Sequence, residues 1–195
     1  MLRDATLDDL PLLGPIEAAG DARFAAAGHP ELADGSTIPL DVARRSIAEE
    51  RLIVADVGQN DYEELSFVAR GDNMGWNTME GFHCFKPRKN CNQSGLKPPF
   101  YEYDHGVGQS ILGGYVYEGT ALPQVRNKYI FADSVAGRIF AIDYQSASAK
   151  ADVLIQAPGL YSSFGRLRNR ELVIAELMSG KIYLLSPTGT VGAPQ

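Results

Sequence analysis

From about residue 51 onward, short apolar runs recur along the chain with turn residues between them, and this pattern limits the fold to one built from many short strands. The runs are LIVADV, ELSFVA, SILGGYVY, KYIFAD, RIFAID, DVLIQA, ELVIAEL and KIYLLS. Short strands at even spacing, separated by Gly, Pro, Asn and Asp, are typical of β-sandwiches and β-propellers. The sequence therefore predicts a mainly β region over residues 51–195.

Two of these strand pairs repeat an internal pattern. The segments ADSVAGRIFAID and AELMSGKIYLLS both place an apolar strand, a small residue with Gly, a basic residue and a second apolar strand in that order. Their Gly137-Arg138 and Gly180-Lys181 dipeptides lie 43 positions apart, within the roughly 40–50 residue period of propeller blades. At that period the β region holds about three blades, which predicts a partial propeller.

The first 50 residues have a different, helical pattern. Thr6 followed by Asp9 is a capping-box pattern ahead of an apolar, Ala-rich stretch. That stretch ends at Gly28-His29-Pro30, where Gly suits a left-handed terminal residue and Pro cannot continue a helix. A second helix is expected to follow. The sequence therefore predicts two domains, a short strand–helix–helix segment over 1–50 and the β region over 51–195.

The N-terminal segment resembles the start of a GNAT-type N-acetyltransferase. The resemblance rests on LRDATLDDLP, ARFAAAGHPELADG and TIPLDVARRSIAEERLIVA, in that order. Such enzymes hold the acetyl-CoA pyrophosphate with backbone N–H groups of an Arg/Gln-x-x-Gly-x-Gly/Ala turn that opens a helix. Neither Arg70–Gly75 nor Gln109–Gly114 has this spacing. An acetyltransferase remnant is therefore the least favoured function.

The β region resembles the glucose/sorbosone dehydrogenase family from residue 51 to about 186. The matching segments are VADVGQNDYEELSFV, GDNMGWNTMEGFHCF, YEYDHGVGQSILGGYVYEG, LPQVRNKYIFADSVAGRIFAI and SGKIYLLSP. This family contains soluble aldose sugar dehydrogenases, six-bladed β-propellers that use pyrroloquinoline quinone (PQQ) and calcium. The resemblance implies a sugar dehydrogenase-like quinoprotein, which would oxidise a sugar hydroxyl with hydride transfer to PQQ.

The resemblance also implies positions for the cofactors. In the family, backbone carbonyls of the D-V-G-Q-N turn bind the calcium that holds PQQ, and the matching residues here are Gly58 and Gln59. The alternative is a blade-edge turn without a metal. A Lys or Arg that meets the PQQ carboxylates follows the second Tyr of the Y-V-Y motif. Here that position is Glu118, and a carboxylate there is expected to repel PQQ.

Other polar and aromatic residues near these motifs are expected to be structural or solvated. Glu63 and Glu64 are neighbours on a strand, so they point to opposite faces and cannot act as a pair. Arg166 and Arg168 have the spacing of an Arg-x-Arg pair that contacts PQQ in some members, but they fall in a predicted solvated basic turn. Trp76 is expected to pack between blades.

No catalytic residue is assigned. The family's base is a histidine from an early blade that has no counterpart here, and His29, His83 and His105 do not match it. The two histidines of the β region are expected in solvent-exposed loops. Cys84 and Cys91 lie seven positions apart, so a disulfide, a pair of free thiols and a zinc site with His83 remain open interpretations.

Charge and hydropathy limit the partners. The chain has 18 basic and 24 acidic side chains, so a basic track for nucleic acid is not expected, and a small neutral sugar fits better. No apolar run reaches the roughly 20 residues of a membrane helix, which predicts no membrane partner. The N-terminus lacks signal-peptide features, whereas the family is usually periplasmic or secreted, so localisation stays open.

About three blades leave unpaired strand edges that favour self-association. Two functions therefore compete with the acetyltransferase remnant: a sugar dehydrogenase-like protein that is incomplete and inactive, and a non-catalytic propeller module for binding or interaction.

Overall fold

The computed structural model describes residues 52–69 and 71–187. The helices predicted for the first 50 residues, and the acetyltransferase resemblance there, lie outside these residues. Most of the described part forms one compact unit, residues 53–67 with 72–187, and the site below lies in it. No helix among the described residues is long and apolar enough to cross a bilayer.

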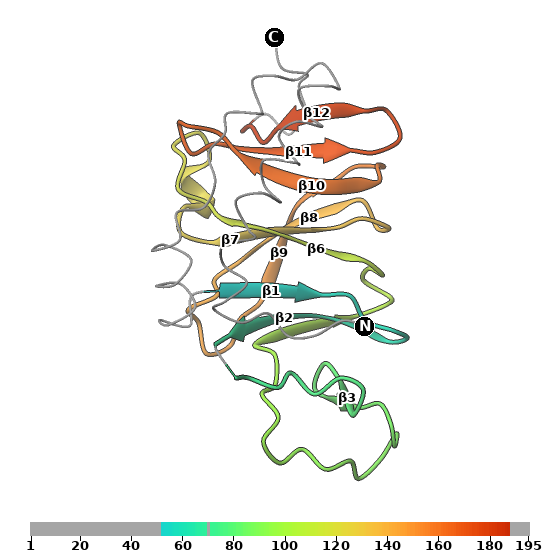
Figure 1. The fold of residues 1–195 in the computed structure, drawn as a ribbon. Coiled ribbons are helices and arrows are strands. Elements are labelled where there is room, and N and C mark those ends of the chain that lie inside the picture. Colours follow the sequence, from blue (N-terminus) through green and yellow to red (C-terminus); the bar gives the residue numbers. More distant parts are fainter. Residues whose placement is uncertain (1–51, 70, 188–195) are drawn as a thin grey trace, which may run out of the picture. The chain divides into compact units, whose positions relative to one another are not determined.

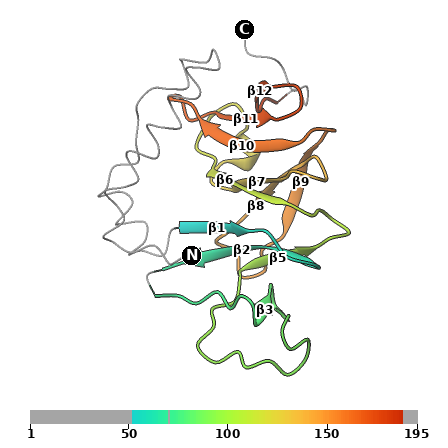
Figure 2. The ribbon, with the colours of Figure 1, turned by 45° about the vertical axis from the view of Figure 1, so that its right-hand side comes forward.

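Antiparallel strands make up the secondary structure of the described residues, together with one short 3-10 helix, η3 (Pro123–Val125). The strands are β1 (Leu52–Asp56), β2 (Tyr62–Val68), β3 (Met79–Glu80), β4 (His83–Cys84), β5 (Tyr101–Asp104), β6 (Ile111–Val116), β7 (Tyr129–Asp133), β8 (Arg138–Ile142), β9 (Ala151–Gln156), β10 (Tyr161–Arg166), β11 (Leu172–Glu176) and β12 (Lys181–Leu184). They form the sheets β1-β2-β5, β6-β7-β8-β9 and β10-β11-β12 and the hairpin β3-β4, shown in Figures 1 and 2. The predicted mainly β, partial propeller is confirmed.

Four strands were not predicted: the two-residue strands β3 and β4, and the longer strands β5 and β10. β5 alternates Tyr with Glu and Asp, and β10 contains two Ser and a Gly, so neither has the apolar run that identifies a strand. Arg166 is the last residue of β10, so the expectation that it lies in a turn is wrong.

The middle sheet carries apolar side chains on both faces. On β7, Ile130 and Ala132 belong to a core shared with β10, β11 and β12. Tyr129 and Phe131, which alternate with them, belong to a second core that includes Leu65 of β2. Successive side chains on a strand point to opposite faces, so a strand covered on both sides is apolar at every position. This explains why β7 and β8 are nearly continuous apolar runs.

The internal repeat extends to a third strand. β1, β7 and β11 have the sequences LIVAD, YIFAD and LVIAE, and each ends in an acidic residue. After β7 and β11 the chain turns through Gly137 and Gly180, at φ values of 63° and 67°, a region that favours Gly. β1 thus corresponds to the second strand of the four-stranded sheet, and no counterpart of β6 precedes it among the described residues.

Candidate functional site

The turn after β1 borders a pocket of about 300 Å³. The lining residues are Asp56, Val57, Gly58, Gln59, Glu64, Trp76 and Glu80. Both turn residues predicted to bind calcium, Gly58 and Gln59, therefore line it, whereas Glu118 does not. Only glycine fits at position 58, because a Cβ atom there would lie 1.7 Å from the Tyr62 carbonyl oxygen.

Glu80 of β3 fixes the conformation of this turn. Its Oε1 accepts hydrogen bonds from the backbone N–H groups of Asn60, Asp61 and Tyr62 at 2.6, 2.9 and 3.4 Å. Burial opposes ionisation of Glu80, but these N–H donors outweigh it and lower the pKa. The N–H and C=O of one trans peptide point in opposite directions. The Gln59 carbonyl therefore faces away from the Glu80 carboxylate and is left for another partner.

The adjacent glutamates of β2 have different surroundings. Glu63 is 0% exposed; its Oε2 accepts the Ile111 N–H at 2.9 Å and its Oε1 lies 2.9 Å from His105 Nε2. Glu64 is 9% exposed and lines the pocket, and its buried Oε2 accepts no hydrogen bond. Glu63 and Glu64 are both buried, so the expectation that they could be solvated is wrong. The alternative expectation, a structural role, agrees with the hydrogen bonds of Glu63.

The Glu64 carboxylate carries an unfavourable charge. Burial, followed by the negative charges of Asp56, Glu102 and Glu80, raises its pKa to about 7, and the nearby Gly81 N–H offsets only part of this. Burial also raises the pKa of Asp56.

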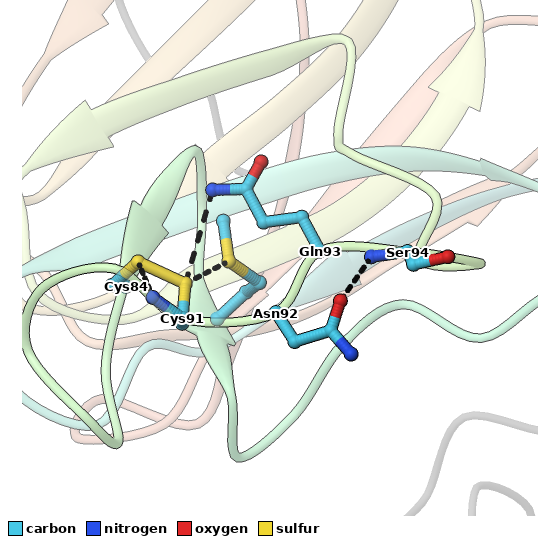
Figure 3. The surroundings of a disulfide bond; sticks show 6 residues. Cys84, Cys91, Asn92, Gln93 and Ser94 are labelled. Atoms are coloured by element: carbon cyan, nitrogen blue, oxygen red, sulfur yellow. Dashed lines mark hydrogen bonds between the residues drawn. A yellow bond between two sulfur atoms is a disulfide. The ribbon is translucent and has the colours of Figure 1, made fainter.

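Trp76 and the disulfide lie close to this pocket. Trp76 is 57% exposed and its ring centroid lies 4.7 Å from that of Phe85, so the expected packing between blades is wrong. Cys84, at the end of β4, forms a disulfide with Cys91 in the following loop (Figure 3), and the described residues include no free cysteine. The disulfide closes the loop between these two residues, and Cys91 Sγ lies 3.3 Å from Met79 Sδ of β3.

The histidines of the β region are paired with glutamates. His83 stacks on Tyr62 at 3.9 Å and its Nε2 lies 2.8 Å from Glu102 Oε1. His105 is partly buried beside Glu63, so its expected solvent exposure is wrong. Neither histidine lines the pocket, so no histidine base stands beside the turn in the part of the chain that the structure describes.

Glu118 lies beyond the far end of β6. Ile111, at the start of β6, is bonded to Glu63, whose neighbour Glu64 lines the pocket. At about 3.3 Å per residue along a strand, Glu118 is roughly 20 Å from Ile111. Its carboxylate pairs with Arg166 at 3.1 Å and Arg170 at 3.3 Å, which offsets the repulsion expected for PQQ. The predicted cofactor residues Gly58, Gln59 and Glu118 thus do not form one pocket.

The donor set at the turn fits a hard cation better than a soft one. Calcium prefers carboxylate, carbonyl and water oxygens, and the pocket offers the first two. Among the described residues, no three His, Cys, Asp or Glu side chains are grouped to hold a metal by themselves. A cation here would therefore use backbone oxygens and water besides side chains.

Comparison with known proteins places these features in a family. The model of the Glucose / Sorbosone dehydrogenase family matches residues 43–191. The HIPL1 and HIPL2 proteins of Arabidopsis thaliana are 34% and 33% identical over 99 and 100 residues, covering 45% and 46% of this chain and 14% of each relative.

Solved structures share the fold at low identity. The apo-form of the soluble aldose sugar dehydrogenase from Escherichia coli has a TM-score of 0.53 at 14% identity, over 69% of this chain and 40% of that one. A glucose dehydrogenase structure has a TM-score of 0.55 at 16% identity, over 72% and 40%. The chain spans less than half of these relatives. Because the family model matches well over half of the chain, the protein belongs to the glucose/sorbosone dehydrogenase family.

Proposed function

We propose that the chain forms the cation-binding part of a sugar dehydrogenase-type quinoprotein site, in which a small neutral sugar is oxidised at a hydroxyl group. The observation that carries this proposal is the pocket at Gly58 and Gln59, the turn that the family resemblance assigns to calcium. A bound PQQ would supply the hydride acceptor, and calcium held by the carbonyl oxygens of Gly58 and Gln59 would supply positive charge.

The chain's own contribution is to shape the turn. Glu80 draws the turn amides to one side, which leaves carbonyl oxygens for a cation. Trp76 lies on the wall of the same pocket, where an exposed indole offers an apolar surface to a flat ligand.

A cationic contact for PQQ and the histidine base of the family are not among the residues that line this pocket. Arg166 and Arg170 neutralise Glu118 and Arg168 adds a further exposed cation, but this cluster stands at the other end of β6. The histidine that serves as the base in the family has no counterpart among the described residues. Full activity therefore requires chain beyond them.

A non-catalytic interaction module is the second candidate, and the sheet edges favour it. Among the described strands, β1 and β12 are edge strands of three-stranded sheets, and Val54 of β1 is 37% exposed. Exposed edges of this kind pair with other strands, which would also allow self-association.

A titration with PQQ, with and without calcium, separates the two candidates. The readout is the fluorescence of Trp76, the only Trp in the chain. Saturable, calcium-dependent quenching followed by sugar-dependent dye reduction supports the quinoprotein. A folded protein that shows no quenching refutes it and leaves the interaction module.

A further inference from the structure

The loop between Cys84 and Cys91, here called the basic loop (residues 85–90), concentrates positive charge on an acidic protein. It carries three exposed cations within four residues, Lys86, Arg88 and Lys89. No acidic residue stands between Glu80 and Glu102 in the sequence, although the net charge of the whole chain is −6. The basic loop is therefore a local surface that attracts anions at short range.

The disulfide holds the basic loop in one shape (Figure 3). It joins the two ends of the loop, and the Cys91 N–H also lies 3.2 Å from Cys84 Sγ. Within the loop, Lys86 Nζ lies over the Phe85 ring at 5.1 Å from its centroid, a contact that favours one position of the ammonium group. A loop that is ordered before binding loses less entropy when a ligand arrives.

Two contacts place the basic loop beside the pocket. Arg88 Nη1 lies 3.2 Å from Asp61 Oδ2, and Asp61 follows the turn at Gly58 and Gln59 that lines the pocket. On the other side, the Phe85 ring centroid lies 4.7 Å from that of Trp76, which also lines the pocket. The cations of the loop therefore stand next to the pocket wall.

The pocket and the basic loop have opposite charges. The pocket is lined by three acidic side chains and no basic one, the acidic residues being Asp56, Glu64 and Glu80. Such a lining disfavours an anionic group inside the pocket, whereas the loop favours one outside it. A ligand that fits both surfaces is uncharged where it enters the pocket and anionic beyond it.

The ion pair of Arg88 indicates which anion fits. Its guanidinium already holds the carboxylate of Asp61, with both side chains largely exposed. Exposed pairs of this kind contribute little to stability, so a carboxylate of a ligand can take the place of Asp61. A guanidinium matches the geometry of a carboxylate with two parallel N–H donors.

We propose that the basic loop binds an acidic polysaccharide whose uronate carboxylates contact Lys86, Arg88 and Lys89, while a neutral unit of the same polymer enters the pocket. This inference deepens the proposed function, because it names the substrate class of the same site. It rests on that function for the oxidation step only, since binding of the polymer requires neither PQQ nor calcium.

Calorimetric titration of the full chain with polygalacturonate tests the inference. A chelator is present and PQQ is omitted, and dextran, dextran sulfate and single-stranded DNA are titrated in parallel at the same ionic strength. We expect saturable binding of polygalacturonate that weakens as salt is added, and no binding of the neutral dextran.

A loop variant and a control of equal charge locate the binding surface. Lys86→Gln with Lys89→Gln should weaken polygalacturonate binding by about threefold to tenfold, as expected for the loss of two exposed ion pairs. Lys150→Gln with Lys181→Gln changes the net charge equally at exposed positions outside the loop, and should leave the affinity within about twofold. Asp61→Asn should strengthen binding, because it removes the carboxylate that competes for Arg88.

The outcomes separate this inference from the proposed function. Polygalacturonate binding that is weakened in the loop variant and kept in the control supports the loop even if PQQ never binds. A folded wild-type protein that binds polygalacturonate no better than dextran overturns it, as does an equal loss in both double variants. Tighter binding of dextran sulfate or DNA assigns the loop to another anion and also overturns it. Oxidation of a neutral sugar with PQQ, without polymer binding, would support the proposed function alone.

Discussion

Replacing Glu64 by Gln should change how the metal-free protein responds to pH. Burial, and after it Asp56, raises the pKa of Glu64 in the folded state from 4.5 to about 7. Between these values the folded protein binds more protons than the unfolded chain, so its stability falls as pH rises. The full penalty is present above pH 7 and absent below pH 4.5.

The size of this change in stability follows from the difference between the two pKa values of Glu64. At about 1.4 kcal/mol per pKa unit, a shift from 4.5 to about 7 corresponds to roughly 3 kcal/mol. Glu64→Gln removes this titration, and any cost of the buried amide is the same at every pH. The stability of the variant relative to wild type should therefore rise by roughly 3 kcal/mol between pH 4.5 and pH 8.

Urea unfolding in the presence of a chelator measures this difference. Trp76 fluorescence and circular dichroism are recorded for both proteins at several pH values. A relative stability that stays constant with pH, or that falls toward pH 8, would refute the assignment of an uncompensated charge to Glu64.

Three further predictions concern the core, the disulfide and the far end of β6. Phe131→Ala should reduce the free energy of unfolding by about 3–5 kcal/mol, because Phe131 is fully buried. Val153→Ala, at an exposed position of β9, should change the free energy of unfolding by no more than about 0.5 kcal/mol. Denaturant titration measures both changes. Reducing the Cys84–Cys91 bond should lower stability by about 2 kcal/mol, as expected for a short closed loop, and melting with and without reductant checks this. Glu118→Gln should change stability by less than about 1 kcal/mol, since its ion pairs are solvent-exposed, and a loss above 2 kcal/mol in urea would contradict that account.

The sequence predicts the fold where one physical signal dominates. The runs YIFAD and RIFAI read as strands because both faces of β7 and β8 are covered by apolar cores. β10 could not be predicted because Ser162, Ser163 and Gly165 interrupt the apolar pattern that identifies a strand. This segment is a strand because it pairs with β11 in the folded protein.

The candidate site is predictable only in part. Gly58 and Gln59 do line a pocket, and the shared ends of LIVAD, YIFAD and LVIAE could have identified Asp56 as a turn-capping position. That the turn amides donate to Glu80 instead could not be predicted, because Glu80 comes from a hairpin elsewhere in the chain. Likewise, the alternation of Glu63 and Glu64 was clear, but the sequence does not show that Glu63 meets His105 and the Ile111 N–H while Glu64 Oε2 has no partner.

The most direct test is anomalous diffraction from crystals of the protein grown with calcium and PQQ. We predict a peak in the pocket at the Gly58–Gln59 turn, within about 2.3–2.6 Å of a turn carbonyl oxygen. An empty pocket in crystals that contain the folded protein would contradict the account.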